Sequence, residues 1–339
     1  MKRRMFLGIC CLGLCGNAWA QPTADEVVWQ APGSKPVSKL TVVADSTETR
    51  GLPQIGQAFK DCTDCPELVL LPTGSFMMGS PASEKGRFDA EGPVHRVTIS
   101  RQIAVGRYEV SRGEFARFVN QSGYKTEAEQ GHGCAVWTGR GMGYKTDRNW
   151  LNPGFDQSDD HPVVCVSWND AQAYLKWLNG KIPGKGFRLL SEAEWEYAGR
   201  AGKGGSRFPW GDDLDDSLMC QYANGADQTA KKQVPGASSW TIANCSDGYA
   251  YTAPAMALAP NAFGLHHMHG NAWEWVQDVW HDQYDGAPDD GSAWEGGTER
   301  SRRVLRGGAW ARYSVGLALR HPPRELSGWL QQIHRFPRC

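Results

Sequence analysis

The sequence predicts an α+β fold with little regular secondary structure. The chain has 339 residues, with forty glycines and fifteen tryptophans, and this composition favours ordered loops held by aromatic packing. Stretches with a helical or strand period are short and lie far apart along the chain. These observations predict one large irregular domain with short helices and strands, preceded by an N-terminal segment.

The N-terminus has the three regions of a secretory signal peptide. Residues 2–4 are basic, residues 5–14 are apolar, and Ala18-Trp19-Ala20 follows. The apolar run is shorter than the roughly 20 residues that span a bilayer. We therefore expect residues 1–20 to be a signal peptide that is cleaved near Ala20, and the mature chain to be periplasmic or secreted. A lipid anchor on Cys15 is the alternative, which the bulky Leu14 disfavours.

The charges of the chain nearly cancel, with 36 Lys and Arg residues against 37 Asp and Glu residues. This balance lacks the basic surface of a nucleic-acid-binding protein and the polybasic segment of a membrane anchor. No segment after the signal peptide is apolar enough to span a membrane. Nucleic acid is therefore excluded as a general partner.

The cysteines indicate an oxidising compartment. Seven remain after residue 20, so six can pair in an exported protein, and the spacing leaves several pairings open. Pairing neighbours in the chain gives Cys62 with Cys65, Cys134 with Cys165 and Cys220 with Cys245, and leaves Cys339 free.

Residues 21–66 show no sustained period and are expected to be a linker or N-terminal extension. The domain is expected to cover residues 67–339. At its start, residues 68–71 and 75–79 flank Pro72-Thr73-Gly74 as two strands around a turn. Alternating residues 94–99 predict a further strand.

Short amphipathic helices are predicted where a Ser or Asn cap precedes apolar residues at helical spacing. A Ser with Glu three positions later forms a capping box, which satisfies two backbone N–H groups at the start of a helix. The predicted caps are Ser111 with Glu114, Ser167 or Asn169 for a helix that ends at Asn179-Gly180, and Ser191 with Glu194.

Seven ordered strings between residues 67 and 320 carry a family resemblance. They are residues 72–79 (PTGSFMMG), 108–111 (YEVS), 161–168 (HPVVCVSW), 188–198 (RLLSEAEWEYA), 208–211 (FPWG), 270–275 (GNAWEW) and 306–310 (RGGAW). Together they resemble the formylglycine-generating enzyme or sulfatase-modifying factor superfamily, which includes pyoverdine-maturation proteins and the C-terminal part of ergothioneine synthases. The resemblance implies an α+β fold related to C-type lectins.

The resemblance also implies two calcium sites, because the family enzyme carries two calcium ions. Calcium prefers six to eight oxygen ligands. The matching residues of the first site are Asn224 and Asp247, through side-chain oxygens, and Gly225 and Tyr249, through carbonyl oxygens. Asn and Asp beside Gly also form ordinary turns, which is the alternative interpretation.

The second implied calcium site is incomplete. Gly270 and Ala272 supply carbonyl oxygens and Glu274 a carboxylate, but His267 stands where the family has an oxygen-bearing Asn. An imidazole nitrogen is a poor calcium ligand. The histidines 266, 267, 269 and 281 with Glu274 allow an alternative, a site for iron or another transition metal, against which stands the ordinary packing of His beside aromatic rings.

The family enzyme's copper-binding cysteine pair is missing. Thiolates bind Cu(I) and support its oxygen chemistry, but Arg312 and Leu317 occupy the two positions, and Ala309 replaces the family's Ser after the glycines. Copper at the family site and formylglycine generation are therefore excluded.

No other catalytic set replaces the missing pair. Cys62 and Cys65 are followed by Pro66 and a strand, whereas a redox Cys-x-x-Cys lies at a helix N-terminus, so a structural disulfide is expected. Glu192, Glu194 and Glu196 are interpreted as structural. The chain has no nucleophile elbow, zinc-protease helix or phosphate loop.

Two functions remain. The first is an oxidoreductase-like enzyme that acts on a peptide or peptide-derived substrate, by analogy with the pyoverdine-maturation members, with Arg306, Arg320 and nearby aromatic residues lining the inherited cleft. The second is a non-catalytic, lectin-like scaffold that binds a peptide or glycan through exposed tryptophans.

Overall fold

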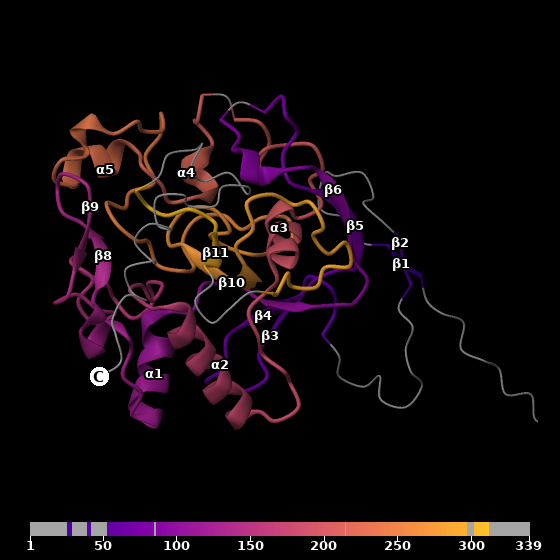
Figure 1. The fold of residues 1–339 in the computed structure, drawn as a ribbon, viewed down its shortest axis with the longest axis horizontal. Coiled ribbons are helices and arrows are strands. Elements are labelled where there is room, and N and C mark those ends of the chain that lie inside the picture. The colour runs from indigo at the N-terminus through magenta and orange to yellow at the C-terminus, as the bar shows by residue number, and fades with distance from the viewer. Residues whose placement is uncertain are drawn as a thin grey trace, which may run out of the picture.

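The computed structural model describes residues 53–84, 86–213, 215–296 and 302–311, together with the backbone of residues 26–28 and 39–41. Within them, short helices and strands alternate with long loops, as the sequence predicts (Figure 1). The helices are α1 (Arg112–Ser122), α2 (Trp168–Lys181), α3 (Glu192–Arg200), α4 (Met219–Tyr222) and α5 (Gln228–Gln233).

The strands form small antiparallel sheets, ordered β1-β2, β3-β4-β7, β5-β6, β8-β9 and β10-β11. Residues 53–66, expected as part of the linker, contribute β3 to the sheet of β4. The predicted strand, turn and strand after residue 67 is confirmed by β4 and β5. The strands are β1 (Glu26–Val28), β2 (Lys39–Thr41), β3 (Ala58–Phe59), β4 (Leu68–Leu70), β5 (Gly74–Met78), β6 (His95–Ile99), β7 (Ala104–Gly106), β8 (Cys134–Trp137), β9 (Met142–Lys145), β10 (Glu274–Val279) and β11 (Arg303–Arg306).

The capping boxes start α1 and α3 as predicted. In α1, the hydroxyl of Ser111 accepts from the Glu114 N–H at 3.2 Å, and the Ser111 N–H donates to the Glu114 carboxylate at 2.8 Å. Ser191 and Glu194 form the same pair in α3. Both helices end at a residue in the left-handed conformation, which closes the last turn.

Helix α2 is capped by Ser167, which forms its box with Asp170. The predicted end at Asn179-Gly180 is two residues too early, because the helix runs to Lys181 and the N–H of Ile182 still bonds to the Leu178 carbonyl at 3.1 Å. Gly in a helix costs only about 1 kcal/mol, so the hydrogen bonds of this last turn outweigh it.

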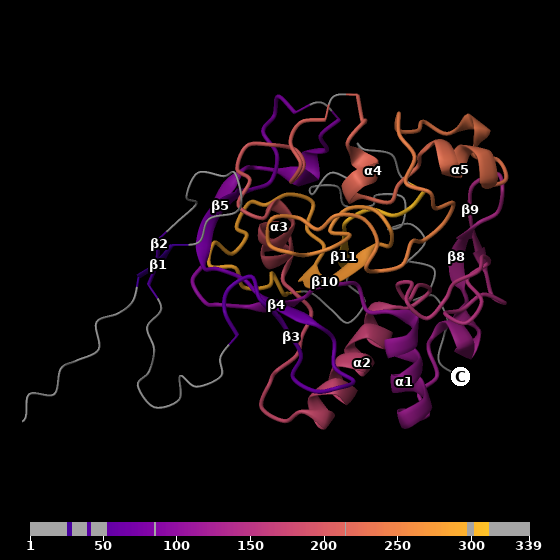
Figure 2. The ribbon, with the colours of Figure 1, turned by 180° about the vertical axis from the view of Figure 1, so that it is seen from behind.

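Helix α3 lies at the centre of the molecule, against β5, β10 and β11 (Figures 1 and 2). Every residue from Glu192 to Arg200 is buried. The main apolar core surrounds this helix, and a second core joins α1 and α2, which lie side by side. No helix among the described residues is long and apolar enough to cross a membrane.

Arg306 is part of this core. It is 0% exposed, its guanidinium lies 2.6 Å from Glu196 and 3.3 Å from Glu192, and Arg200 pairs with Glu196 at 2.7 Å. The prediction that Arg306 lines a cleft is therefore wrong, because its charge is used to neutralise carboxylates inside the fold. The structural interpretation of the α3 glutamates is confirmed. Arg320 lies outside the described residues.

The disulfides are those obtained by pairing neighbours in the chain. Cys62 bonds to Cys65, Cys134 to Cys165 and Cys220 to Cys245. The signal peptide and Cys339 lie outside the described residues. Three disulfides agree with folding in an oxidising compartment.

Candidate functional site

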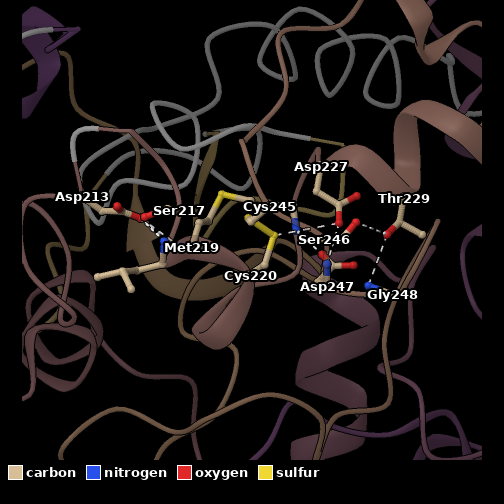
Figure 3. The surroundings of a disulfide bond; sticks show 12 residues. Asp213, Ser217, Met219, Cys220, Asp227, Thr229, Cys245, Ser246, Asp247 and Gly248 are labelled. Carbon is tan, nitrogen blue, oxygen red and sulfur yellow. Dashed lines mark hydrogen bonds between the residues drawn. A yellow bond between two sulfur atoms is a disulfide. The ribbon is translucent and has the colours of Figure 1, made fainter.

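The candidate site forms where two loop segments meet. Residues 224–229 connect α4 to α5, and residues 243–249 lie beside them (Figure 3). Backbone hydrogen bonds join the segments: the Ala243 N–H donates to the Ala226 carbonyl at 2.8 Å, and the Gln228 N–H to the Cys245 carbonyl at 3.1 Å. The site is therefore fixed by two paired segments rather than by a regular sheet.

A disulfide and side-chain hydrogen bonds hold these segments together. Cys220 in α4 bonds to Cys245, two residues before Asp247. The Thr229 hydroxyl lies 3.3 Å from the Ser246 hydroxyl and accepts from the Gly248 N–H at 3.3 Å. The disulfide thus ties α4, which precedes the first segment, to the second segment, and the Thr229 contacts join the two segments directly (Figure 3).

The structure brings together the four residues predicted for the first calcium site. Asp247 accepts from the Tyr249 N–H at 2.7 Å and from the Gly225 N–H at 3.3 Å. Asn224, which is 0% exposed, donates to the Tyr251 carbonyl at 2.8 Å. Its side-chain oxygen is buried and has no hydrogen-bond partner, a costly arrangement unless a ligand reaches it.

Gly270 fixes the position of Asn224. The two residues form a bridge, and the Asn271 N–H donates to the Asn224 carbonyl at 2.8 Å. Gly270 has φ +77°, and a Cβ there would overlap the Asn224 carbonyl oxygen. Glycine is required at this close approach, so the 270–275 string also positions the site.

Asp227 belongs to the same cluster, although we did not predict it from the sequence. Carboxylate oxygens of Asp227 and Asp247 and the Cys220 sulfur lie within 4.8 Å of one another. Burial raises the pKa of Asp247 to about 7, and the charge of Asp227 adds to this rise. The signal in the sequence was an Asp N-cap directly before a short helix and three residues after Asn224.

The donors of this cluster suit calcium. They are carboxylate and amide oxygens, and Cys220 offers no thiolate because it is oxidised in the disulfide. Hard oxygen ligands with two negative charges favour calcium over a transition metal. The unpartnered Asn224 oxygen is the observation that fits a bound cation.

The second calcium position does not fit. His267 is 1% exposed, and its Nε2 lies 3.2 Å from the Pro254 carbonyl, which can only accept, so Nε2 carries the proton. Burial lowers the pKa of His267 to about 4, and the ring is neutral at pH 7. The oxygen that the family places here is absent, and the imidazole is bound elsewhere.

Glu274 is instead held by the core. It accepts from the Trp195 indole at 3.0 Å, and burial raises its pKa to about 7. Burial and the charge of Glu274 raise the pKa of Glu109, which accepts from the Ala272 N–H at 3.1 Å. Both carboxyl groups are therefore favoured in the protonated form by their buried positions.

The histidines of the transition-metal alternative lie in separate surroundings. His266 packs against Tyr108 with ring centroids 5.0 Å apart, and His281 stacks on Trp294 at 3.6 Å. His269 packs against Trp210 at 5.1 Å. Within residues 53–311, apart from the gaps named above, the structure groups three ligand-type side chains of His, Cys, Asp or Glu only at Cys220, Asp227 and Asp247, and no histidine is among them.

An aromatic cluster lies beside the candidate site. Tyr251 stacks on Phe155 with centroids 4.7 Å apart and packs edge-on against Trp310 at 4.9 Å. Trp240 contacts Trp310 at 6.0 Å and Trp137 at 4.9 Å. All five rings are partly exposed, so together they form an aromatic surface, which we call the aromatic cluster.

Comparison with known proteins identifies the family. The model of the sulfatase-modifying factor enzyme 1-like domain matches residues 54–325. The chain belongs to this family. The bovine (Bos taurus) formylglycine-generating enzyme is 36% identical over 236 residues, which cover 63% of the chain and 58% of that relative. The chain thus spans less than two thirds of that enzyme.

Two further relatives match more of their own length. The protein named inactive C-alpha-formylglycine-generating enzyme 2 of Bos taurus is 31% identical over 74% of the chain and 78% of the relative. The solved structure of PvdO from Pseudomonas aeruginosa, a pyoverdine-maturation relative, is 37% identical, with TM-score 0.63 over 80% of the chain and 95% of PvdO. The fold and the resemblance drawn from the seven strings are therefore confirmed.

The family's cysteine positions come two and seven residues after Trp310. Arg312 and Leu317, which occupy them, lie outside the described residues. Trp310 itself is fixed, because its N–H donates to the Asn271 carbonyl at 3.1 Å. The aromatic cluster therefore marks where the chain enters the region that carries the thiols in the family enzyme.

Proposed function

We propose that this protein is an exported member of the family that oxidises a peptide or peptide-derived substrate without the copper-thiolate chemistry of formylglycine generation. Arg312 and Leu317 cannot provide two thiolates. The similarity to PvdO, which covers 95% of that chain, supports a role like that of the pyoverdine-maturation members.

The observation that carries this proposal is the aromatic cluster, whose Trp310 comes two residues before Arg312 in the sequence. The rings of Trp310, Tyr251 and Phe155 are partly exposed and pack against one another, and Trp310 is one residue before the last described residue of this segment. Such rings bind apolar and planar parts of a peptide with little loss of side-chain entropy. The cluster would bind and orient the substrate, and dioxygen would accept its electrons.

Export is supported by the basic and apolar regions of residues 1–20 and by the three disulfides of the described domain. Disulfides persist in the periplasm and outside the cell. We place the mature protein in the periplasm or in secreted form.

We propose that the protein also binds one calcium ion. Asn224, Gly225, Asp247 and Tyr249 would hold it with side-chain and carbonyl oxygens. The ion would fix the loop that leads to Tyr251 and the aromatic cluster. The position of Gly270, Ala272 and Glu274 would hold none, because His267 supplies no oxygen.

The test uses purified mature protein with periplasmic peptide extracts. Oxygen consumption is followed with an electrode and the products by mass spectrometry. Trp310→Ala should lower kcat/KM by about tenfold, since a buried aromatic contact contributes on the order of 1 kcal/mol or more. Trp280→Ala, a half-buried tryptophan outside the cluster, should change it less than about twofold.

A second candidate function is non-catalytic binding through the same aromatic cluster. It is favoured if calcium-loaded protein retains peptides or glycans from the extract while no oxygen is consumed. That result would contradict the oxidation proposal. Conversion of the cysteine in a sulfatase-derived peptide to formylglycine would contradict it as well.

A further inference from the structure

We infer that Asp227 is a ligand of the proposed calcium ion, so that this site carries two carboxylates instead of the one that the family resemblance implies. The inference rests on the calcium site proposed above. Asp227 is the N-cap of α5 and is 0% exposed. Its place in the fold is therefore fixed before any ion binds.

The hydrogen bonds of Asp227 leave room for a cation. Oδ1 accepts from the Ala230 N–H at 2.8 Å, and Oδ2 accepts from the Asp247 N–H at 2.6 Å. A carboxylate has about four lone-pair positions, so two accepted bonds do not exhaust it. Asp247 likewise accepts two backbone N–H groups and keeps free lone pairs.

Among the described residues, no side chain supplies a counter-charge. Among the ion pairs of the described residues, none joins a Lys or Arg to Asp227 or Asp247. Two carboxylates within 4.8 Å of each other in a buried site repel strongly. Only a proton or a bound cation relieves this repulsion.

A separate observation points to a cation. The side-chain oxygen of Asn224 is buried without a partner, and Asn224 directly precedes Gly225, whose N–H donates to Asp247. A shared proton between the aspartates would leave this amide oxygen unsatisfied. A calcium ion would use it together with both carboxylates.

The disulfide keeps the two carboxylates at this distance. The Cys220 sulfur lies 3.9 Å from Asp227 Oδ2, and Cys220 is bonded to Cys245 in the segment of Asp247 (Figure 3). The site therefore does not have to assemble when calcium arrives. A preorganised, doubly charged oxygen site is expected to bind calcium more tightly than a site with one carboxylate.

The experiment compares chelator-stripped full-length protein, Asp227→Asn and Asp213→Asn by calorimetric titration with calcium. Asn at 227 can still cap α5, so the change removes mainly the charge. Asp213 lies outside the site but also accepts backbone N–H groups at the start of a helix, those of Leu218 and Met219 at α4, and serves as the control. Asp227→Asn should weaken the calcium Kd by about tenfold or more and Asp213→Asn by less than about twofold.

Thermal unfolding separates a ligand from a helix cap. Without calcium, Asp227→Asn should unfold at the same or a higher temperature than the wild type, because the repulsion is gone. With saturating calcium it should unfold at a lower temperature. A role as helix cap alone predicts the same difference between the variant and the wild type with and without calcium, and that result would overturn the inference. If Asp227→Asn does not fold, Asp227→Ser, which also caps helices, replaces it.

The outcomes distinguish the two claims. Wild-type protein that binds calcium while Asp227→Asn binds it equally well overturns the role of Asp227 alone. Wild-type protein that binds no calcium overturns the proposed calcium site and this inference together.

Discussion

Two of the regions that bury carboxylates differ in what neutralises them. Around α3, Arg306 and Arg200 pair with Glu196 at 2.6 and 2.7 Å, and Arg306 also approaches Glu192. Around Asp227 and Asp247 the described chain offers no cationic partner. The first region has its counter-charges built into the sequence and is structural. The second requires a proton or a ligand, and this marks it as a site.

The largest loss of stability is expected from removing Arg306 from the buried ion pairs around α3. Arg306→Met leaves two glutamates with Arg200 as their remaining partner, and losing one member of a buried ion network costs roughly 3–5 kcal/mol. Arg302→Met removes an arginine whose nearest carboxylate, Asp282, is exposed and 3.6 Å away, which should cost less than about 1 kcal/mol. Urea unfolding of both variants measures the difference, and equal stabilities would contradict the role of Arg306.

The contribution of Glu192 to stability is expected to depend on pH. Burial raises its pKa to about 7 although Arg306 opposes the shift, whereas the unfolded chain has a pKa near about 4.3. Between these two pKa values, Glu192 is therefore protonated in the folded state and ionised in the unfolded state. The stability contributed by this group is present at acidic pH and is lost as the pH rises through 7.

Glutamine mimics the protonated form of Glu192. Glu192→Gln should gain stability relative to the wild type by on the order of 2 kcal/mol as the pH rises from about 5 to about 8. Denaturant unfolding at several pH values checks this. A difference between variant and wild type that does not change with pH would show that Glu192 does not titrate in this range.

Removing the disulfide between Cys220 and Cys245 tests whether the site of Asp227 and Asp247 is preorganised. The double variant Cys220→Ser with Cys245→Ser should weaken calcium binding by about tenfold, because the two ligand segments must then be ordered on binding. Cys134→Ser with Cys165→Ser is the matched control. The two double variants lose disulfides of similar sequence separation, 25 and 31 residues. Equal calcium affinities of the two would contradict the role of the Cys220–Cys245 disulfide in holding the ligand segments together.

The smallest effect is expected at Thr229. Its hydroxyl contacts Ser246 and accepts from the Gly248 N–H, so Thr229→Val should cost about 0.5–1.5 kcal/mol. The loss should appear as faster amide hydrogen exchange in residues 246–249. Unchanged exchange there would mean that the backbone bonds of Ala243 and Gln228 hold the loop without this hydroxyl.

Local sequence patterns predicted the helix starts and the first strands because the deciding contacts are near in sequence. Ser111 and Ser191 each form the box with a Glu three residues later. The end of α2 was misplaced because Gly180 is tolerated within a helix when the following turn is hydrogen-bonded. A Gly signal is weak where tertiary contacts continue the helix.

The candidate site was predicted in part. The resemblance implied that Asn224, Gly225, Asp247 and Tyr249 form one site, and the structure places Asp247 against the backbone of Gly225 and Tyr249. That this site holds calcium stays a prediction. Asp227 was missed because the resemblance implies only four ligand positions at this site, and no helix was predicted at α5, which Asp227 caps. Arg306 was misassigned because nothing in the string RGGAW shows that its partners, Glu192 and Glu196, lie more than 100 residues earlier in the chain and inside the core.

Calcium titration of the chelator-stripped wild-type protein, with unfolding followed at each concentration, tests the central claim most directly. The account predicts one calcium ion per chain and a rising unfolding temperature, with about 2.7 kcal/mol gained at a calcium concentration one hundred times the Kd. No bound calcium and an unchanged unfolding temperature would contradict it.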